Sequence, residues 1–186
     1  MSNSIKYVLI TSIIVFFIFI SESTAQITAF SVGGSIGVGG LKGNSPSQTS
    51  LSGDLFLDFY PSFIDFISIR LKFNYSQKAE YFLPENRSNR YYPFVKSFSA
   101  NVFVEQYIDS KIFVEEGIGV LLLNDHTFSD VNTWNYGMMF NALAGWDLRN
   151  FSDSGFRIGF GTEYGLTFTN SSASFYSFYL QGQYFL

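Results

Sequence analysis

The sequence predicts an all-β protein, an eight-stranded antiparallel up-and-down transmembrane β-barrel preceded by a cleaved signal peptide. Three observations predict it. The chain opens with a single short apolar run behind a lysine, and eight later segments alternate apolar and polar residues. The composition combines 20% aromatic with only 14% charged residues. Because soluble proteins carry about 25% charged residues, we expect much of this surface to contact lipid.

Residues 1–25 have the parts of a secretory signal peptide. Lys6 supplies the positive charge, residues 7–20 are mostly apolar, and Ser23-Thr24-Ala25 places small residues before a cleavage site. The apolar run is shorter than the roughly 20 residues that a membrane-spanning helix needs. An uncleaved N-terminal anchor is the alternative. We therefore expect a signal peptide over 1–25 and one barrel domain over 26–186.

The rest of the chain has the period of two that is typical of strands with two different faces. In one segment Ile67, Ile69 and Leu71 alternate with polar residues. The segments are long compared with soluble strands, which average about 5–6 residues, and suit membrane strands of roughly 9–11. The expected strands are residues 27–39, 50–60, 67–75, 97–105, 111–123, 134–149, 156–168 and 176–186.

The connections between these segments alternate in length. They are tight after the second, fourth and sixth strands, and longer after the first, third and fifth. Short periplasmic turns and longer outside loops are the usual asymmetry of outer-membrane barrels. An even number of strands returns both termini to the periplasmic side.

The two faces differ in a way that indicates which one contacts lipid. The polar face is rich in Gly and Ser and carries charges of both signs, whereas the apolar face is bulky, with aromatic residues near the strand ends. Bulky outward faces with aromatic girdles are typical of membrane barrels. A soluble lipocalin-like carrier is the alternative, and it would need the apolar face inside.

The pattern resembles the small OmpA/OmpX-type barrels of the bacterial outer-membrane β-barrel family. The resemblance covers residues 26–186 and rests on the signal site, the eight strands, the FVEEGIGV stretch and the terminal strand FYSFYLQGQYFL. That strand is similar to a C-terminal sorting signal, although it ends in Leu186 behind Phe185. The resemblance implies a bacterial outer-membrane location, contact with outer-membrane lipid and lipopolysaccharide, insertion by the barrel-assembly machinery, and a structural or surface-recognition role.

Charged residues on the polar face are expected to fill the barrel. Eight strands leave an interior that side chains just fill, and buried charges must pair. We therefore expect a network of salt bridges and hydrogen bonds. A narrow gated channel, in which Arg70, Lys72 or Arg157 changes carboxylate partners, is the alternative. The network comprises Asp54, Asp58, Arg70, Lys72, Glu105, Glu115, Arg157 and Glu163, with Asp147 and Arg149 beside it.

The connection over residues 76–93 is a candidate recognition loop. It combines arginines with aromatic residues, a mixture that protein-binding surfaces favour, and exposed loops on rigid scaffolds often carry recognition. A loop that only folds over the barrel rim is the alternative. The candidate residues are Tyr81, Phe82, Arg87, Arg90, Tyr91 and Tyr92.

An enzyme is not expected, although one alternative is specific. Some small outer-membrane barrels deacylate lipid A with a Ser/His/acid site, and His126 is the one histidine of the chain. The family pattern has serine two residues after the histidine, but here that residue is Phe128. Ser129 comes third and would alternate to the other face, while Asp125 and Asp130 could orient a base.

Several other classes of function are excluded or not expected. The chain has no cysteine, which excludes disulfides and thiolate metal sites, and a net charge of −4, which does not suit a nucleic-acid binder. We expect no cofactor, no metal and a monomer. Strict alternation places Glu116 on the lipid face near mid-strand; we expect a β-bulge to redirect it, with a protein contact such as a dimer interface as the alternative.

Overall fold

The computed structural model describes most of the chain outside its N-terminus. The predicted signal peptide, residues 1–25, lies outside the described residues. No helix in the described part is long and apolar enough to span a membrane. The described residues are 27–43, 46–62, 64, 66–83, 91–149, 154–169 and 172–186.

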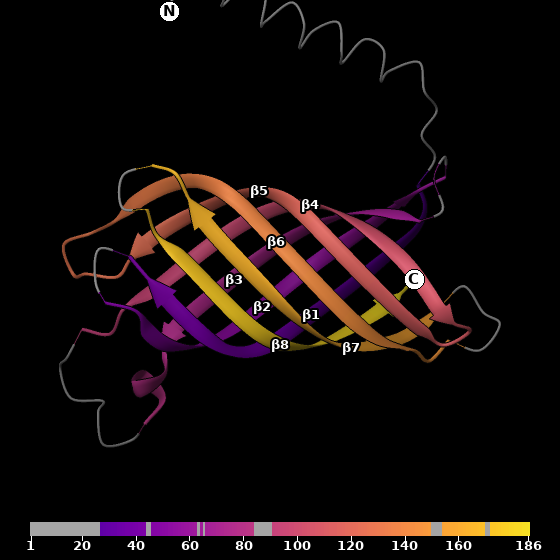
Figure 1. Ribbon diagram of the computed structural model, residues 1–186, viewed down its shortest axis with the longest axis horizontal. Coiled ribbons are helices and arrows are strands. Elements are labelled where there is room, and N and C mark those ends of the chain that lie inside the picture. Colours follow the sequence, from indigo (N-terminus) through magenta and orange to yellow (C-terminus); the bar gives the residue numbers. More distant parts are fainter. Residues whose placement is uncertain are drawn as a thin grey trace, which may run out of the picture.

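Eight antiparallel strands close into one barrel, which confirms the predicted fold (Figure 1). Each strand pairs with its neighbours in sequence, and β1 closes the barrel against β8, with Ser31 opposite Phe185 and Lys42 opposite Ser174. The strands are β1 (Ile27–Lys42), β2 (Gln48–Pro61), β3 (Ile67–Lys78), β4 (Phe94–Asp109), β5 (Ile112–His126), β6 (Thr133–Asp147), β7 (Gly155–Thr167) and β8 (Ser174–Phe185).

The side chains alternate between the lumen and the outer wall as the sequence predicts. On β7, Arg157 and Glu163 point inward and are buried, whereas Phe156, Ile158 and Phe160 point outward and are about half exposed. The other strands follow the same rule, so the wall is apolar and most lumen-facing positions are polar. A lipocalin-like interior would need the opposite arrangement.

Aromatic pairs lie on the outer wall near both ends of the strands. At one end Tyr75 packs on Phe94, with ring centroids 5.6 Å apart. At the other end Phe156 packs on Tyr184 at 4.7 Å. Rings at these two levels match the aromatic girdles of membrane barrels. We call the end with the chain termini the inner end and the opposite end the outer end.

The strands extend further at the outer end than their apolar alternation predicts. The sequence pattern ends the first strand at residue 39 and the fifth at residue 123, but β1 continues to Lys42 and β5 to His126. Pairing continues because each neighbouring strand still offers backbone partners, and Asp125 lies opposite Val95 and Thr133. Apolar and polar residues alternate only where the outer face of a strand contacts lipid. The alternation therefore ends where the strands extend beyond the apolar band.

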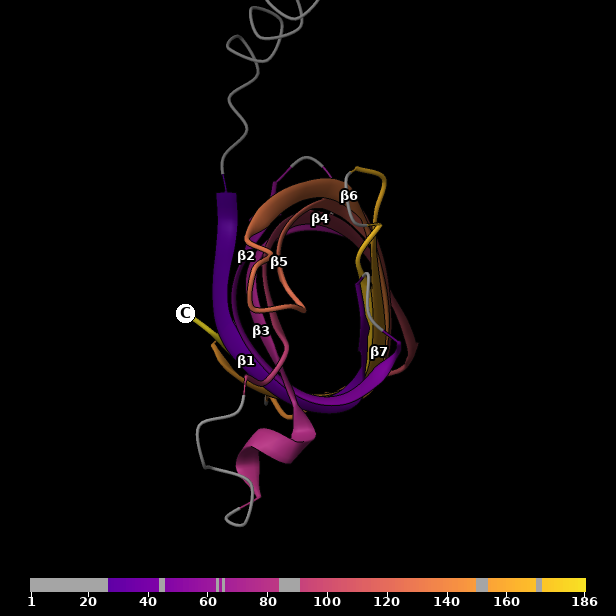
Figure 2. The ribbon, with the colours of Figure 1, turned by 90° about the vertical axis from the view of Figure 1, so that its left-hand side faces the viewer.

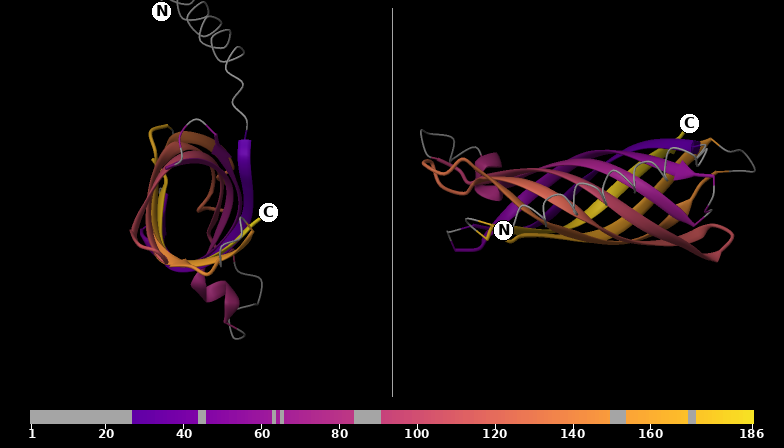
Figure 3. Two further views of the ribbon diagram at one scale, coloured as in Figure 1. Left: turned by 90° about the vertical axis from the view of Figure 1, so that its right-hand side faces the viewer. Right: turned by 90° about the horizontal axis from the view of Figure 1, so that it is seen from above.

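Two connections at the outer end lie in different places. The 3-10 helix η1 (Ala79–Phe82) follows β3 and lies outside the ring of strands, not over its opening (Figures 2 and 3). The connection after β5 instead leans across the opening. Its Thr127 is buried and lies against Gly43 at the end of β1, on the other side of the barrel.

The prediction of a β-bulge at Glu116 is wrong. Pairing on both sides of β5 is regular there, with Glu116 opposite Val104 and Ala142, and the side chain is exposed on the outer wall. Glu116 is the fifth residue of β5, counted from its inner end at Ile112, so it lies well below mid-strand. A carboxylate near the membrane boundary is much less unfavourable than one at the midplane, which removes the need for a bulge.

Candidate functional site

Arg70 is the most enclosed cation of the lumen. Its Nε lies 2.7 Å from Oδ1 of Asp58, and its Nη2 lies 3.1 Å from Oε2 of Glu115. The guanidinium carbon also lies 4.2 Å from the ring centroids of both Phe56 and Phe103. Two carboxylates and two ring faces hold this side chain from four sides, so it has no open direction in which to move.

Lys72 is the next lumen-facing residue after Arg70 on β3, and it forms a second group of ion pairs. Its Nζ lies 2.8 Å from Asp54 and 2.5 Å from Glu163, which come from β2 and β7. Asn74 donates a further hydrogen bond to Glu163 at 3.2 Å. Because β3 and β7 lie on opposite sides of the barrel, the Lys72–Glu163 pair crosses the lumen and ties its walls together.

Arg157 forms a third group near the inner end. Its Nη1 lies 2.6 Å from Glu105, and its Nε lies 2.9 Å from Asp147. The same guanidinium lies 3.7 Å from Glu115, which links this group to that of Arg70. Arg149 also pairs with Asp147, at 2.7 Å. The structure thus joins all eight predicted lumen charges into pairs, each cation with at least two carboxylates.

An apolar plug fills the lumen toward the outer end, beyond the Lys72 group. The alternation rule would have located it, because these apolar residues occupy inward positions. The prediction of a uniformly polar lumen face did not include them. The plug consists of Leu41, Val95, Leu121, Leu123, Met139, Ala173 and Phe175, all of which are buried.

The predicted recognition loop divides into two parts. Tyr81 and Phe82 lie on η1 outside the wall, and both are about half exposed. On the returning segment the Tyr91 hydroxyl donates to the backbone oxygen of His126 at 2.5 Å, and the Tyr92 ring packs on that of Tyr81 at 5.6 Å. The loop is therefore attached to the rim at its base. Arg87 and Arg90 lie outside the described residues.

His126 does not form the hydrolytic arrangement considered above. Its ring stacks on Phe94, with centroids 4.5 Å apart. Ser129 donates instead to the neighbouring Asp130 at 2.7 Å, and Asp125 accepts the backbone N–H of Thr127 at 2.8 Å. No hydrogen bond joins the histidine to this serine among the described residues, nor do those residues contain a cluster of three candidate metal ligands.

The comparisons relate this fold to solved outer-membrane barrels. Neisserial surface protein A (NspA) is similar with a TM-score of 0.62 and 9% identity, covering 83% of this chain and 95% of that one. Ail, the attachment invasion locus protein of Yersinia pestis, gives 0.52 and 11%, covering 85% and 97%. At these identities the likeness concerns the fold alone. No protein-family model matches the sequence, and no curated protein is significantly similar to it.

Proposed function

We propose that this chain is an integral β-barrel of the bacterial outer membrane, exported by its signal peptide, with a closed lumen and a recognition role at the cell surface. The apolar wall, the two aromatic levels and the fold of NspA and Ail support the location. The resemblance of the terminal strand to a sorting signal supports insertion by the barrel-assembly machinery.

The contents of the lumen favour recognition over transport. The Lys72–Glu163 pair crosses the barrel, the apolar plug lies beyond it, and Thr127 reaches Gly43 across the outer opening. An ion would have to displace paired charges and then pass a cluster of buried apolar side chains. Both steps are unfavourable in a low-dielectric interior. We therefore propose that the barrel serves as a rigid support and not as a channel, and that it acts as a monomer without catalytic activity.

One observation carries the recognition role: a group of half-exposed aromatic and apolar side chains projects from the rim. We call Tyr81, Phe82, Leu83 and Tyr91 the aromatic ledge; their exposed fractions are 44–53%. Exposed apolar clusters on an otherwise rigid surface mark binding sites, and aromatic residues with arginine are enriched in protein interfaces. The partner proposed is a protein at the cell surface. Ail, which shares the fold, is named for attachment.

The location is tested by gel mobility of the outer-membrane fraction, boiled against unboiled. We expect a heat-dependent shift and an N-terminus at Gln26. Protein in the soluble periplasmic fraction that shows no shift would contradict the membrane assignment.

The recognition role is tested with Tyr81→Ser combined with Phe82→Ser. We expect cells that carry this variant to bind fewer immobilised host or bacterial surface proteins than cells with the wild-type chain. Phe128→Ser is the matched control, because Phe128 is 42% exposed on the neighbouring connection but outside the ledge. Equal binding by all three strains, at equal surface levels, would remove the recognition role.

A further inference from the structure

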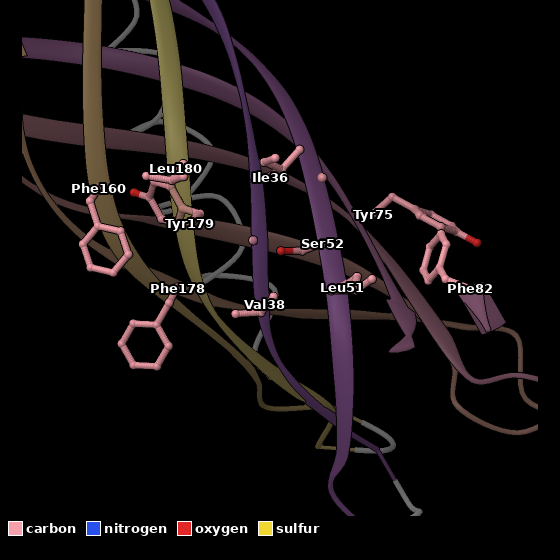
Figure 4. Close-up of a pocket in the computed structure, with 12 residues that line it drawn as sticks. Ile36, Val38, Leu51, Ser52, Tyr75, Phe82, Phe160, Phe178, Tyr179 and Leu180 are labelled. Atoms are coloured by element: carbon pink, nitrogen blue, oxygen red, sulfur yellow. The ribbon is translucent and has the colours of Figure 1, made fainter. Parts of the chain in front are cut away.

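A furrow runs along the outer wall where β7, β8, β1 and β2 lie side by side. Its outer part has a volume of about 740 Å³ and is lined by Ile36, Val38, Leu51 and Leu180, with Phe82 of η1 at one edge (Figure 4). A second hollow of about 660 Å³ continues from it, because Ile36, Phe160 and Leu180 line both. This inner part ends at Trp146, so the furrow spans much of the apolar band.

Glycines on the outer wall form the floor of the furrow. A Cβ atom built at Gly53 would meet nothing nearer than 3.8 Å, and one built at Gly182 would meet nothing within 4 Å. The other glycines of the described strands would bring a Cβ to 3.2 Å or less of another atom. Among the strand glycines that the structure describes, only these two leave open space where a side chain would be. The furrow is therefore a true depression in a wall of large side chains.

An exposed cation lies beyond the outer end of the furrow. Lys42 lies four residues beyond Val38 on β1 and faces the same side of the strand. At the usual rise of a strand, the two residues are roughly 13 Å apart. It has no hydrogen bond or ion pair in the part of the chain that the structure describes. A lysine at the membrane surface attracts anionic head groups. An apolar furrow with an exposed cation beyond its outer end has the polarity of a lipid, with the acyl chain in the furrow and the phosphate near the lysine.

We propose that the furrow binds an acyl chain of an anionic, phosphate-bearing lipid of the outer leaflet, whose phosphate group contacts Lys42. The proposal rests on the membrane location proposed above. In a furrow with glycines at its base, one extended acyl chain is contacted from both sides and from below. A flat part of the wall would contact the chain from one side only. A second copy of the barrel would present a convex wall of rings and would leave Lys42 without an anion.

Native mass spectrometry of the folded barrel in dodecyl maltoside tests this site. The probes are dimyristoyl phosphatidic acid and dimyristoyl phosphatidylcholine, which share acyl chains and differ in head-group charge. We expect the wild-type barrel to retain one phosphatidic acid molecule in preference to phosphatidylcholine. Gly53→Leu with Gly182→Leu fills the furrow and should weaken this retention at least tenfold.

Two further variants separate the acyl chain from the phosphate. Ala100→Leu adds a leucine side chain to the outer wall of β4, on the opposite side of the barrel from β8 and the furrow, and should leave retention unchanged. Lys42→Gln should reduce retention of phosphatidic acid about fivefold, the factor expected for one lysine near an anionic head group, and leave phosphatidylcholine unaffected.

The outcomes that would overturn the proposal are distinct. Equal retention by the furrow-filled and control variants would mean that lipid binds only as an annulus around the barrel. A wild-type dimer that the furrow-filling substitutions dissociate would assign the furrow to a second copy. Heat-dependent mobility is measured for every variant, and Gly182→Leu alone is used if the double variant does not fold. A barrel that never shows this mobility contradicts the membrane location itself.

Discussion

The lumen and the outer wall of this barrel place similar side chains under different constraints. Glu115 and Glu116 are consecutive residues on β5. Glu115 is buried in the lumen between Arg70 and Arg157, at 3.1 and 3.7 Å, whereas Glu116 is exposed on the wall with no partner among the described residues. Each charged side chain in the lumen needs a particular partner of opposite charge, because a buried charge must be paired. The wall requires only an average apolar character and tolerates a charged residue near its edge.

The largest effect should come from removing one cation of the lumen. Arg70→Met leaves Asp58 and Glu115 with less compensation inside the barrel, and breaking a buried pair in this way costs about 3–5 kcal/mol. The free energy of unfolding, from denaturant titration in lipid vesicles followed by tryptophan fluorescence, gives the measurement. Lys78→Met is the control, because Lys78 pairs with Glu80 at the surface and should contribute about 0–1 kcal/mol. Similar losses for both variants would mean that water hydrates the lumen.

The apolar plug should show a slightly smaller effect by a different mechanism. Leu123→Ala leaves a cavity beside the other plug residues, and such substitutions cost about 2–5 kcal/mol. Met139→Leu keeps the volume of the plug and should cost less than about 1.5 kcal/mol. The same unfolding titration measures both. If Leu123→Ala cost no more than Met139→Leu, the outer part of the lumen would not be close-packed.

The fold could be predicted from the sequence because lipid imposes a simple rule on the wall. Most outward positions between the girdles are apolar, so alternation located all eight strands. The rule ends with the apolar band, which is why the outer ends of β1 and β5 extend three residues beyond the predicted 39 and 123.

The lumen and the rim were less predictable, because they depend on contacts between distant strands. Alternation placed Lys72 and Glu163 inward, but their pairing depends on which strands face each other across the closed barrel. The apolar plug depends on depth along the lumen, a variable that alternation does not report. The position of η1 outside the wall follows from local packing near β2 and β3, and no sequence pattern indicated it.

A matched pair of glycines sharpens the comparison between the two faces. A Cβ at Gly37, which faces the lumen, would approach the backbone oxygen of Phe178 to 2.8 Å, whereas Gly53 on the wall has open space. Gly37→Ala should therefore cost about 1–3 kcal/mol through overpacking. Gly53→Ala should be neutral or should stabilise by up to about 1 kcal/mol, since alanine restricts the unfolded chain. Denaturant midpoints compare the two, and equal midpoints would contradict the close packing of the lumen wall.

The smallest effect is expected at Glu116, and its sign matters more than its size. Glu116→Gln removes a charge from the lipid-facing wall near the inner boundary, so stability should stay the same or rise by less than about 1 kcal/mol. Glu115→Gln is the control one residue away, and it should destabilise the barrel because Arg70 and Arg157 lose a carboxylate. Unfolding titrations in vesicles measure both. A loss of stability at Glu116→Gln that increases with protein density in the membrane would show instead that its carboxylate contacts another protein.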